Sequence, residues 1–222
     1  MDKLFIVANL KSYKTQNEAK EWLEIFVNID KTLLEDKTII ICPSFTLFET
    51  FKTALSQHNL NVKLGAQNVS PFNEGPYTGE VNAKQIKEFA DYVLIGHSER
   101  RRLLNETDDM VLKKVQEVFV NNLKPLFFVQ TTDMQIPAEI ELVVYEPPDS
   151  ISGASGGIPD DVEDVLKSAE KIKAKGQYQV LYGGSINSAN VKDFTIHSNV
   201  SGVVVGKESL NAQEFIKIIK NA

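Results

Sequence analysis

The sequence predicts an α/β protein, a (β/α)8 barrel, on three observations. Eight short apolar runs recur along its 222 residues, and helical patterns separate most of them. Within the runs the apolar residues are consecutive, as in parallel strands that are covered on both faces. Eight strand–helix units in this length fit a small closed barrel better than a doubly wound sheet. We therefore expect residues 1–222 to form a single (β/α)8 barrel domain.

The predicted elements follow from these patterns. The strands are Leu4–Asn9, Thr38–Cys42, Lys63–Gln67, Tyr92–Gly96, Leu126–Val129, Glu141–Tyr145, Gln179–Tyr182 and Gly202–Val205. Thr15 and Glu18 have the spacing of a capping box, and a helical apolar stripe follows them at residues 19–26. A similar stripe covers residues 162–172, and Asn211 opens a last predicted helix.

One interval is too short for a complete unit. Only Gln130–Ile140 separates the fifth predicted strand from the sixth, and Pro137 interrupts it. A crossover between parallel strands usually takes a dozen or more residues, including a helix. We therefore expect the helix after the fifth strand to be reduced to about one turn or to be missing.

Composition excludes several classes of protein. The formal net charge of −6 lacks the basic excess that nonspecific nucleic-acid binding needs. No apolar run reaches the length of a membrane span, and a strand begins too early for a signal peptide. The single cysteine, Cys42, fits a reducing cytoplasm and reads best as a small buried hydrophobe. No residues have metal-ligand or nucleotide-cofactor spacing, so we expect no metal and no cofactor.

Polar residues at the carboxyl ends of the predicted strands are the candidates for chemistry, because parallel barrels place their sites there. Strand alternation points Asn9 and Lys11 the same way, into the mouth of the barrel. A lysine there could neutralise an anionic substrate or an oxyanion, although a solvated loop lysine explains this residue equally well by itself.

A histidine and a glutamate stand at two of these ends. His97 precedes a predicted helix start, which favours a neutral imidazole able to donate a hydrogen bond to a substrate carbonyl. Glu146 precedes two prolines and a segment rich in glycine and serine, the layout of a lid that closes over a ligand. A carboxylate at the base of such a lid is a candidate for proton abstraction.

Glycines mark the ends of the last two predicted strands. Gly183, Gly184 and Ser185 follow the seventh strand, and Gly206 and Lys207 follow the eighth. Loops at these two places frequently bind phosphate in (β/α)8 barrels, because backbone N–H groups can approach the anion closely.

These motifs together resemble the triosephosphate isomerase family over the whole chain. The matching pieces are Asn9-Leu10-Lys11, Ala66-Gln67-Asn68-Val69, Tyr77-Thr78-Gly79-Glu80-Val81, Gly96-His97-Ser98-Glu99-Arg100-Arg101, Tyr145-Glu146-Pro147 and Tyr182-Gly183-Gly184-Ser185. The resemblance implies a cytoplasmic, cofactor-free enzyme of glycolysis and gluconeogenesis. It would interconvert dihydroxyacetone phosphate and D-glyceraldehyde 3-phosphate through an enediolate. This family is itself the standard illustration of a neutral imidazole acting as electrophile.

The resemblance also implies a role for each matching residue. Glu146 would be the base, His97 the electrophile, Lys11 the neutralising cation and Asn9 a support for the enediolate, with Glu99 beside the site. Thr78 would reach into a partner's site, which implies a homodimer. The residues implied in substrate and phosphate binding are Ile151, Ser152, Gly183, Gly184, Ser185, Gly206 and Lys207.

Departures from the family pattern leave alternatives open. The usual Gly-Thr-Gly lid tip is replaced by Ser152-Gly153-Ala154, Lys207 stands where a second glycine is common, and residues 127–131 replace a Cys-x-Gly-Glu pattern. Short members of the family can form tetramers. A phosphate-binding barrel with little or no turnover is the main alternative function. Another phosphosugar isomerase on the same barrel is a weaker one.

Overall fold

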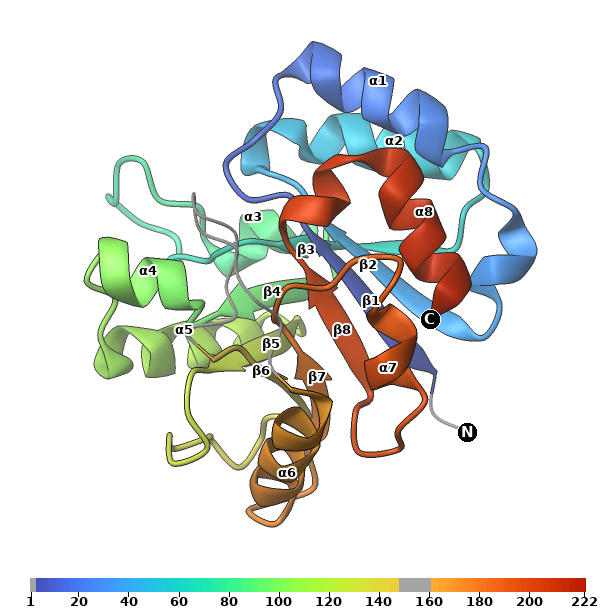
Figure 1. Ribbon diagram of the computed structural model, residues 1–222. Helices are drawn as coiled ribbons and strands as arrows, with labels where there is room; N and C mark the ends of the chain where they lie inside the picture. Colours follow the sequence, from blue (N-terminus) through green and yellow to red (C-terminus); the bar gives the residue numbers. More distant parts are fainter. Residues whose placement is uncertain (1–2, 148–160) are drawn as a thin grey trace.

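The computed structural model describes residues 3–147 and 161–222, and its eight parallel strands close into a barrel (Figure 1). Each strand pairs with its neighbours in chain order, and β8 pairs with β1 to complete the circle. The strands are β1 (Leu4–Asn9), β2 (Lys37–Cys42), β3 (Val62–Ala66), β4 (Tyr92–Ile95), β5 (Lys124–Val129), β6 (Leu142–Tyr145), β7 (Gln179–Tyr182) and β8 (Gly202–Val205). The predicted fold class is therefore confirmed, with strand ends that differ by at most two residues.

Helices surround the barrel, and α1, α2 and α8 lie together on one side of it (Figure 1). The helices are α1 (Gln16–Phe26), α2 (Phe48–Gln57), α3 (Ala83–Lys87), α4 (Ser98–Leu103), α5 (Asp108–Val120), α6 (Val162–Lys173), α7 (Val191–Thr195) and α8 (Ala212–Asn221). Short 3-10 turns occupy η1 (Lys31–Leu34), η2 (Phe45–Leu47) and η4 (Lys207–Leu210). Within the described part of the chain, no helix has both the length and the apolar character needed to cross a membrane.

The interval between β5 and β6 contains no helix. All residues from 130 to 141 are described, and they form bends, turns and irregular chain. The helix labelled α5 precedes β5, so the missing helix is the one expected after that strand. The prediction from the short interval is confirmed.

Local signals set the helix ends as the sequence indicates. The Thr15 hydroxyl accepts a hydrogen bond from the Glu18 N–H, and the Glu18 carboxylate accepts one from the Thr15 N–H at 2.7 Å. This reciprocal capping box begins α1. At α8 the Asn211 side chain accepts a hydrogen bond from the Glu214 N–H. Each cap of this kind stabilises its helix by about 1 kcal/mol.

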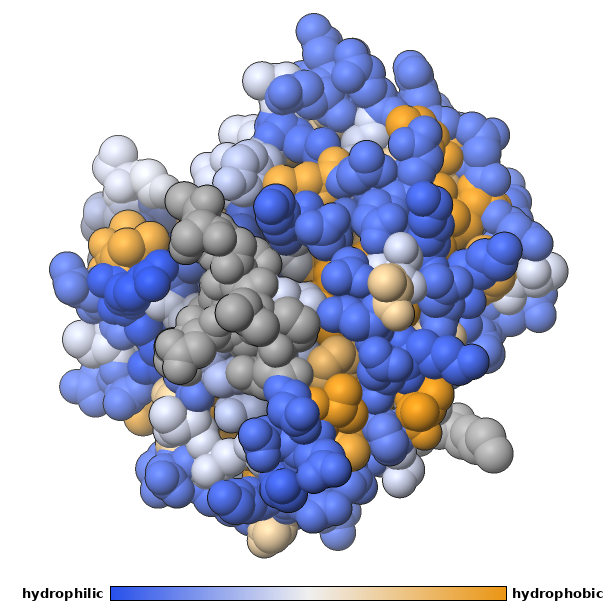
Figure 2. Space-filling model, in the orientation of Figure 1, coloured by the Kyte–Doolittle hydropathy of each residue, from blue (hydrophilic) through white to orange (hydrophobic). Residues whose placement is uncertain are grey.

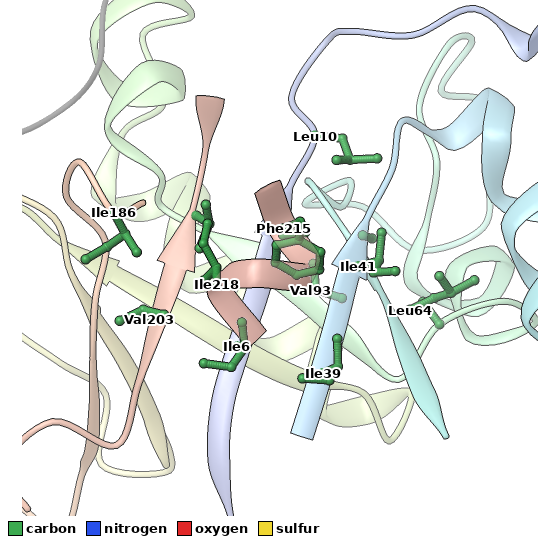
Figure 3. Packing of buried hydrophobic residues seen from close by; sticks show 14 of the residues in the cluster. Ile6, Leu10, Ile39, Ile41, Leu64, Val93, Ile186, Val203, Phe215 and Ile218 are labelled. Carbon is green, nitrogen blue, oxygen red and sulfur yellow. The ribbon is translucent and has the colours of Figure 1, made fainter. Parts of the chain in front are cut away.

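Alternation along the strands divides the apolar core into two layers. Val7, Cys42 and Phe128 belong to a cluster inside the barrel, whereas Ile6 belongs to a larger cluster between the sheet and the helices. Figure 3 shows part of this outer layer, in which Phe215 of α8 lies among outward-facing residues of the first strands. Burial raises the pKa of the Cys42 thiol, in keeping with its expected role as a core hydrophobe.

The same alternation positions the site. Every second side chain of a strand points inward, so the position two residues beyond the last interior side chain lies at the mouth of the barrel. These positions include Asn9, Gln67, Gln130 and Glu146, together with the glycines Gly96, Gly183 and Gly206. The barrel thus presents a polar layer directly above its apolar interior.

Candidate active site

Lys11 lies in a strained backbone conformation at the end of β1. Its φ of +51° is in the left-handed region, which costs a non-glycine residue roughly 1–2 kcal/mol. Two hydrogen bonds hold it there, from the Lys11 N–H to Asn9 Oδ1 at 3.1 Å and from Gln67 Nε2 to the Lys11 carbonyl at 2.8 Å. The strain is therefore maintained by neighbours at the barrel mouth, as is typical of functional positions.

His97 follows a sharp turn at the end of β4. Gly96 has a φ of +76°, which ends the strand one residue earlier than predicted and sends the chain into α4. His97 caps that helix: the Glu99 N–H donates to its Nδ1 at 3.2 Å. Because a backbone N–H can only donate, Nδ1 is unprotonated and the proton of the neutral ring is on Nε2. The ring also lies 4.9 Å from the Phe128 ring, centroid to centroid.

Glu146 meets His97 across the mouth, although 49 positions separate the two in the sequence. Its Oε1 lies 3.1 Å from His97 Nε2, the nitrogen that carries the proton. Its Oε2 accepts hydrogen bonds from Ser98 Oγ at 2.7 Å and from the Ser98 N–H at 3.3 Å. Glu146 is 4% exposed and His97 is 5% exposed, so a carboxylate and a hydrogen-bond donor share one shielded position.

An ion pair completes the opposite wall of the site. Lys11 Nζ lies 2.6 Å from Glu99 Oε1, and the lysine side chain is half as exposed as the glutamate, 17% against 34%. This pair joins the end of β1 to the first turn of α4. The carboxylate of Glu99 offsets the positive charge of the Lys11 ammonium group and holds that group at the cavity that His97 also lines.

A cavity of about 280 Å³ opens beside these groups, a volume suited to a small molecule or to one inserted side chain. It is lined by Asn9, Lys11, Ser12, Gln67, Asn68, His97, Glu99, Arg100, Leu103 and Leu104. Leu103 is the last residue of α4 and Leu104 follows it, and they are 64% and 60% exposed. Figure 2 shows apolar surface over α4.

The glycines of the last two strands border the same site. A Cβ on Gly183 would lie 3.0 Å from the Val144 side chain and 3.4 Å from Glu146 Cβ, so only glycine leaves the glutamate undisturbed. A Cβ on Gly206 would lie 3.7 Å from Lys11 Nζ, which places this glycine directly against the lysine. Gly183 and Gly206 therefore lie beside two of the catalytic candidates, Glu146 and Lys11.

The remaining candidates are placed differently. Gly184 and Ser185 follow Gly183 in the loop after β7, and Lys207 is exposed at the start of η4. Thr78 lies in the exposed loop after β3, where Phe72 and Tyr77 stack at 4.3 Å. Ile151 and Ser152 lie outside the described residues.

Three neighbours of the site were not assigned roles from the sequence. Ser98 holds the Glu146 carboxylate, Phe128 packs against His97, and Gln67 donates to the carbonyls of both Lys11 and Cys42, each at 2.8 Å. Ser98 and Gln67 do belong to motifs recognised in the sequence. Their contacts depend on how the folded sheet brings the ends of nearby strands together, which spacing alone does not reveal.

Known proteins resemble this chain along nearly its whole length. The family model described as triosephosphate isomerase matches residues 4–222. A triosephosphate isomerase of Dictyoglomus turgidum is 32% identical over 252 residues, covering 100% of both chains. One of Thermodesulfovibrio yellowstonii is 34% identical over 251 residues, covering 99% of this chain and 100% of its own, and one of Aquifex aeolicus is 30% identical over 243 residues, covering 96% and 97%.

Proposed function

The chain belongs to the triosephosphate isomerase family and is an isomerase, and on this premise we propose that it interconverts dihydroxyacetone phosphate and D-glyceraldehyde 3-phosphate. The observation that carries the proposal is the meeting of Glu146 with the protonated nitrogen of His97 at 3.1 Å. A carboxylate and a neutral donor this close can act on adjacent atoms of one three-carbon substrate. No cofactor is needed for such a proton transfer.

The proposed reaction moves one proton between two carbons. Glu146 takes the proton from the carbon next to the carbonyl, and the electron pair of that C–H bond forms the double bond of an enediolate. The Nε2–H of His97 donates to the carbonyl oxygen as charge develops there, and Lys11 adds electrostatic stabilisation. Glu146 then returns the proton to the neighbouring carbon. His97 gives its Nε2 proton to the former carbonyl oxygen and takes the proton of the former hydroxyl oxygen, so the hydroxyl and carbonyl groups exchange places. Asn9, 4% exposed beside Lys11, supports the enediolate oxygens.

The phosphate group would lie at the ends of β7 and β8. We assign its binding to the backbone N–H groups of Ser185, Gly206 and Lys207, with Gly183 and Gly184 allowing close approach. Lys207 is exposed at this edge, so its side chain can add a cation near the dianion. Ile151 and Ser152 are the residues proposed to close over the ligand.

A coupled assay with matched variants tests the assignment. Glu146→Gln keeps the size of the side chain but removes the base, so turnover should fall by at least a thousandfold with little change in substrate affinity. Glu141→Gln is the control and should leave turnover unchanged. Glu141 is exposed and directly precedes β6, at the end of that strand away from Glu146. Near-native turnover by Glu146→Gln would refute the assigned base.

The same assay separates the alternative functions. A phosphate-binding barrel without turnover would bind inorganic phosphate but isomerise nothing. Another phosphosugar isomerase would prefer five-carbon substrates to three-carbon ones. Inhibition of the wild-type activity by a phosphate-bearing enediolate mimic supports the proposal over both.

We also propose that the protein acts as a cytoplasmic homodimer. The exposed Tyr77–Thr78 loop and the exposed leucines beside the site cavity are the surfaces that a second copy would cover. Thr78→Arg should then give a monomeric mass in solution and lose most of the turnover. Thr53→Arg, on the exposed surface of α2, is the control and should do neither. A tetrameric mass for the wild type would indicate a further interface.

A further inference from the structure

Gln130 stands at the mouth of the barrel between the two elements that carry His97 and Glu146. Phe128 faces the interior of the barrel, so strand alternation turns Gln130 toward the same side one layer higher. On one side of β5 lies β4, which leads into Gly96 and His97. On the other side lies β6, where the Glu146 N–H donates to the Val129 carbonyl at 2.9 Å.

The side-chain amide of Gln130 contacts the turn that carries His97. Its Nε2 donates to the Gly96 carbonyl oxygen at 3.3 Å. The same oxygen accepts a second hydrogen bond, from Arg101 Nε of α4 at 3.1 Å. Donors from two different elements therefore converge on one carbonyl. That carbonyl belongs to the peptide unit that joins Gly96 to His97, so its direction sets the direction of the His97 backbone.

The turn needs such support because Gly96 itself constrains the chain little. Glycine has wide backbone freedom, and the φ of +76° here is only one of the conformations open to it. Without external hydrogen bonds the peptide unit before His97 could rotate. The distance between the imidazole and the reacting atoms would then change. A displacement of about 1 Å can lower the rate on the order of a hundredfold.

We propose that Gln130 is a positioning residue for His97, acting through the Gly96 carbonyl; the proposal rests on the isomerase function proposed above. The amide is required as a hydrogen-bond donor. A glutamate of the same shape accepts only, and its charge would face a carbonyl oxygen beside the Glu146 carboxylate. A methionine fills nearly the same volume but donates nothing.

The test compares Gln130→Met and Gln130→Glu with Thr131→Ala, an exposed neighbour in the same loop that serves as control. Loss of one neutral hydrogen bond predicts a fall in kcat of roughly fivefold to tenfold for Gln130→Met, with KM within twofold. Gln130→Glu should fall further. NMR of protein labelled with 15N-histidine should show a shift of the His97 ring signals in both variants and none in Thr131→Ala.

The two readouts keep the outcomes distinct. An unchanged kcat in Gln130→Met, or a fall in kcat without movement of the His97 signals, would overturn the positioning role. The ring signals report on His97 whether or not the protein turns substrate over. A wild type without isomerase activity would therefore refute the proposed function, while the NMR comparison would still decide what Gln130 holds in place.

Discussion

Replacing Lys114 by methionine should destabilise the protein severely, because Lys114 is the centre of a buried charged cluster. The side chain is 1% exposed on α5, and its Nζ donates to Asn68 Oδ1 at 2.7 Å and to Glu106. Glu106 also accepts a hydrogen bond from Arg100 Nε at 2.9 Å. Burial alone would raise the pKa of Glu106, but hydrogen bonds and charge from Lys114 and Arg100 outweigh it and hold the pKa below 4.5.

The size of the effect follows from what methionine leaves behind. Glu106 would stay buried with Arg100 as its remaining cation, and breaking a buried pair in this way costs about 3–5 kcal/mol. For a domain of this length, each kcal/mol lowers Tm by about 2–4 °C, so the fall in Tm should be roughly 6–20 °C. Glu106→Gln combined with Lys114→Met should cost less than the two single changes added together, because the pair is removed as a unit.

Thermal unfolding followed by circular dichroism measures this prediction, with Lys113→Met as the control. Lys113 is the exposed neighbour on the same helix, so its replacement should change Tm by no more than about 1 °C. The folded pKa of Glu106 lies below its unfolded value, so its contribution is complete above about pH 4.5 and is lost as the pH falls through the folded pKa. The difference between wild type and Lys114→Met should therefore shrink below that pH. A fall in Tm of less than 2 °C at pH 7 would refute the reasoning.

Three further substitutions test the site and its support. Gly96→Ala forces a side chain into the left-handed region, so we expect about 1–2 kcal/mol of destabilisation in denaturant unfolding and a fall in kcat as His97 shifts. Gly183→Ala places a methyl group 3.0 Å from Val144 and against Glu146, so kcat should fall by more than tenfold while Tm changes little. A large fall in Tm together with the fall in kcat would contradict this. Trp22→Phe leaves a buried carbonyl without its indole donor at 3.0 Å and should cost about 1–3 kcal/mol, measured in urea.

The sequence predicted the barrel because its signals are local. Consecutive apolar residues indicate covered parallel strands. Asn9 and Lys11, which we expected at the mouth of the barrel, both line the cavity there. The short interval before β6 was enough to predict a missing helix. Each of these inferences depends on a few neighbouring residues and on general rules of strand geometry.

The contacts within the site could not be predicted in the same way. The hydrogen bond from Ser98 to Glu146 and the bonds from Gln67 join residues 25 to 56 positions apart, and they form only when the folded sheet brings the ends of those strands together. Lys114 is similar. A lysine within an amphipathic helix is normally exposed, and its burial depends on Asn68, which lies 46 residues away.

The direct passage from β5 to β6 has a consequence for how the chain folds. Leu126 pairs with Leu142, and no other two neighbouring strands of the barrel are so close in sequence. Contacts between residues near in sequence cost the least chain entropy and form early. We therefore expect β5 and β6 to pair at the start of folding, which would put Glu146 at the growing edge of the sheet before the circle of strands is complete.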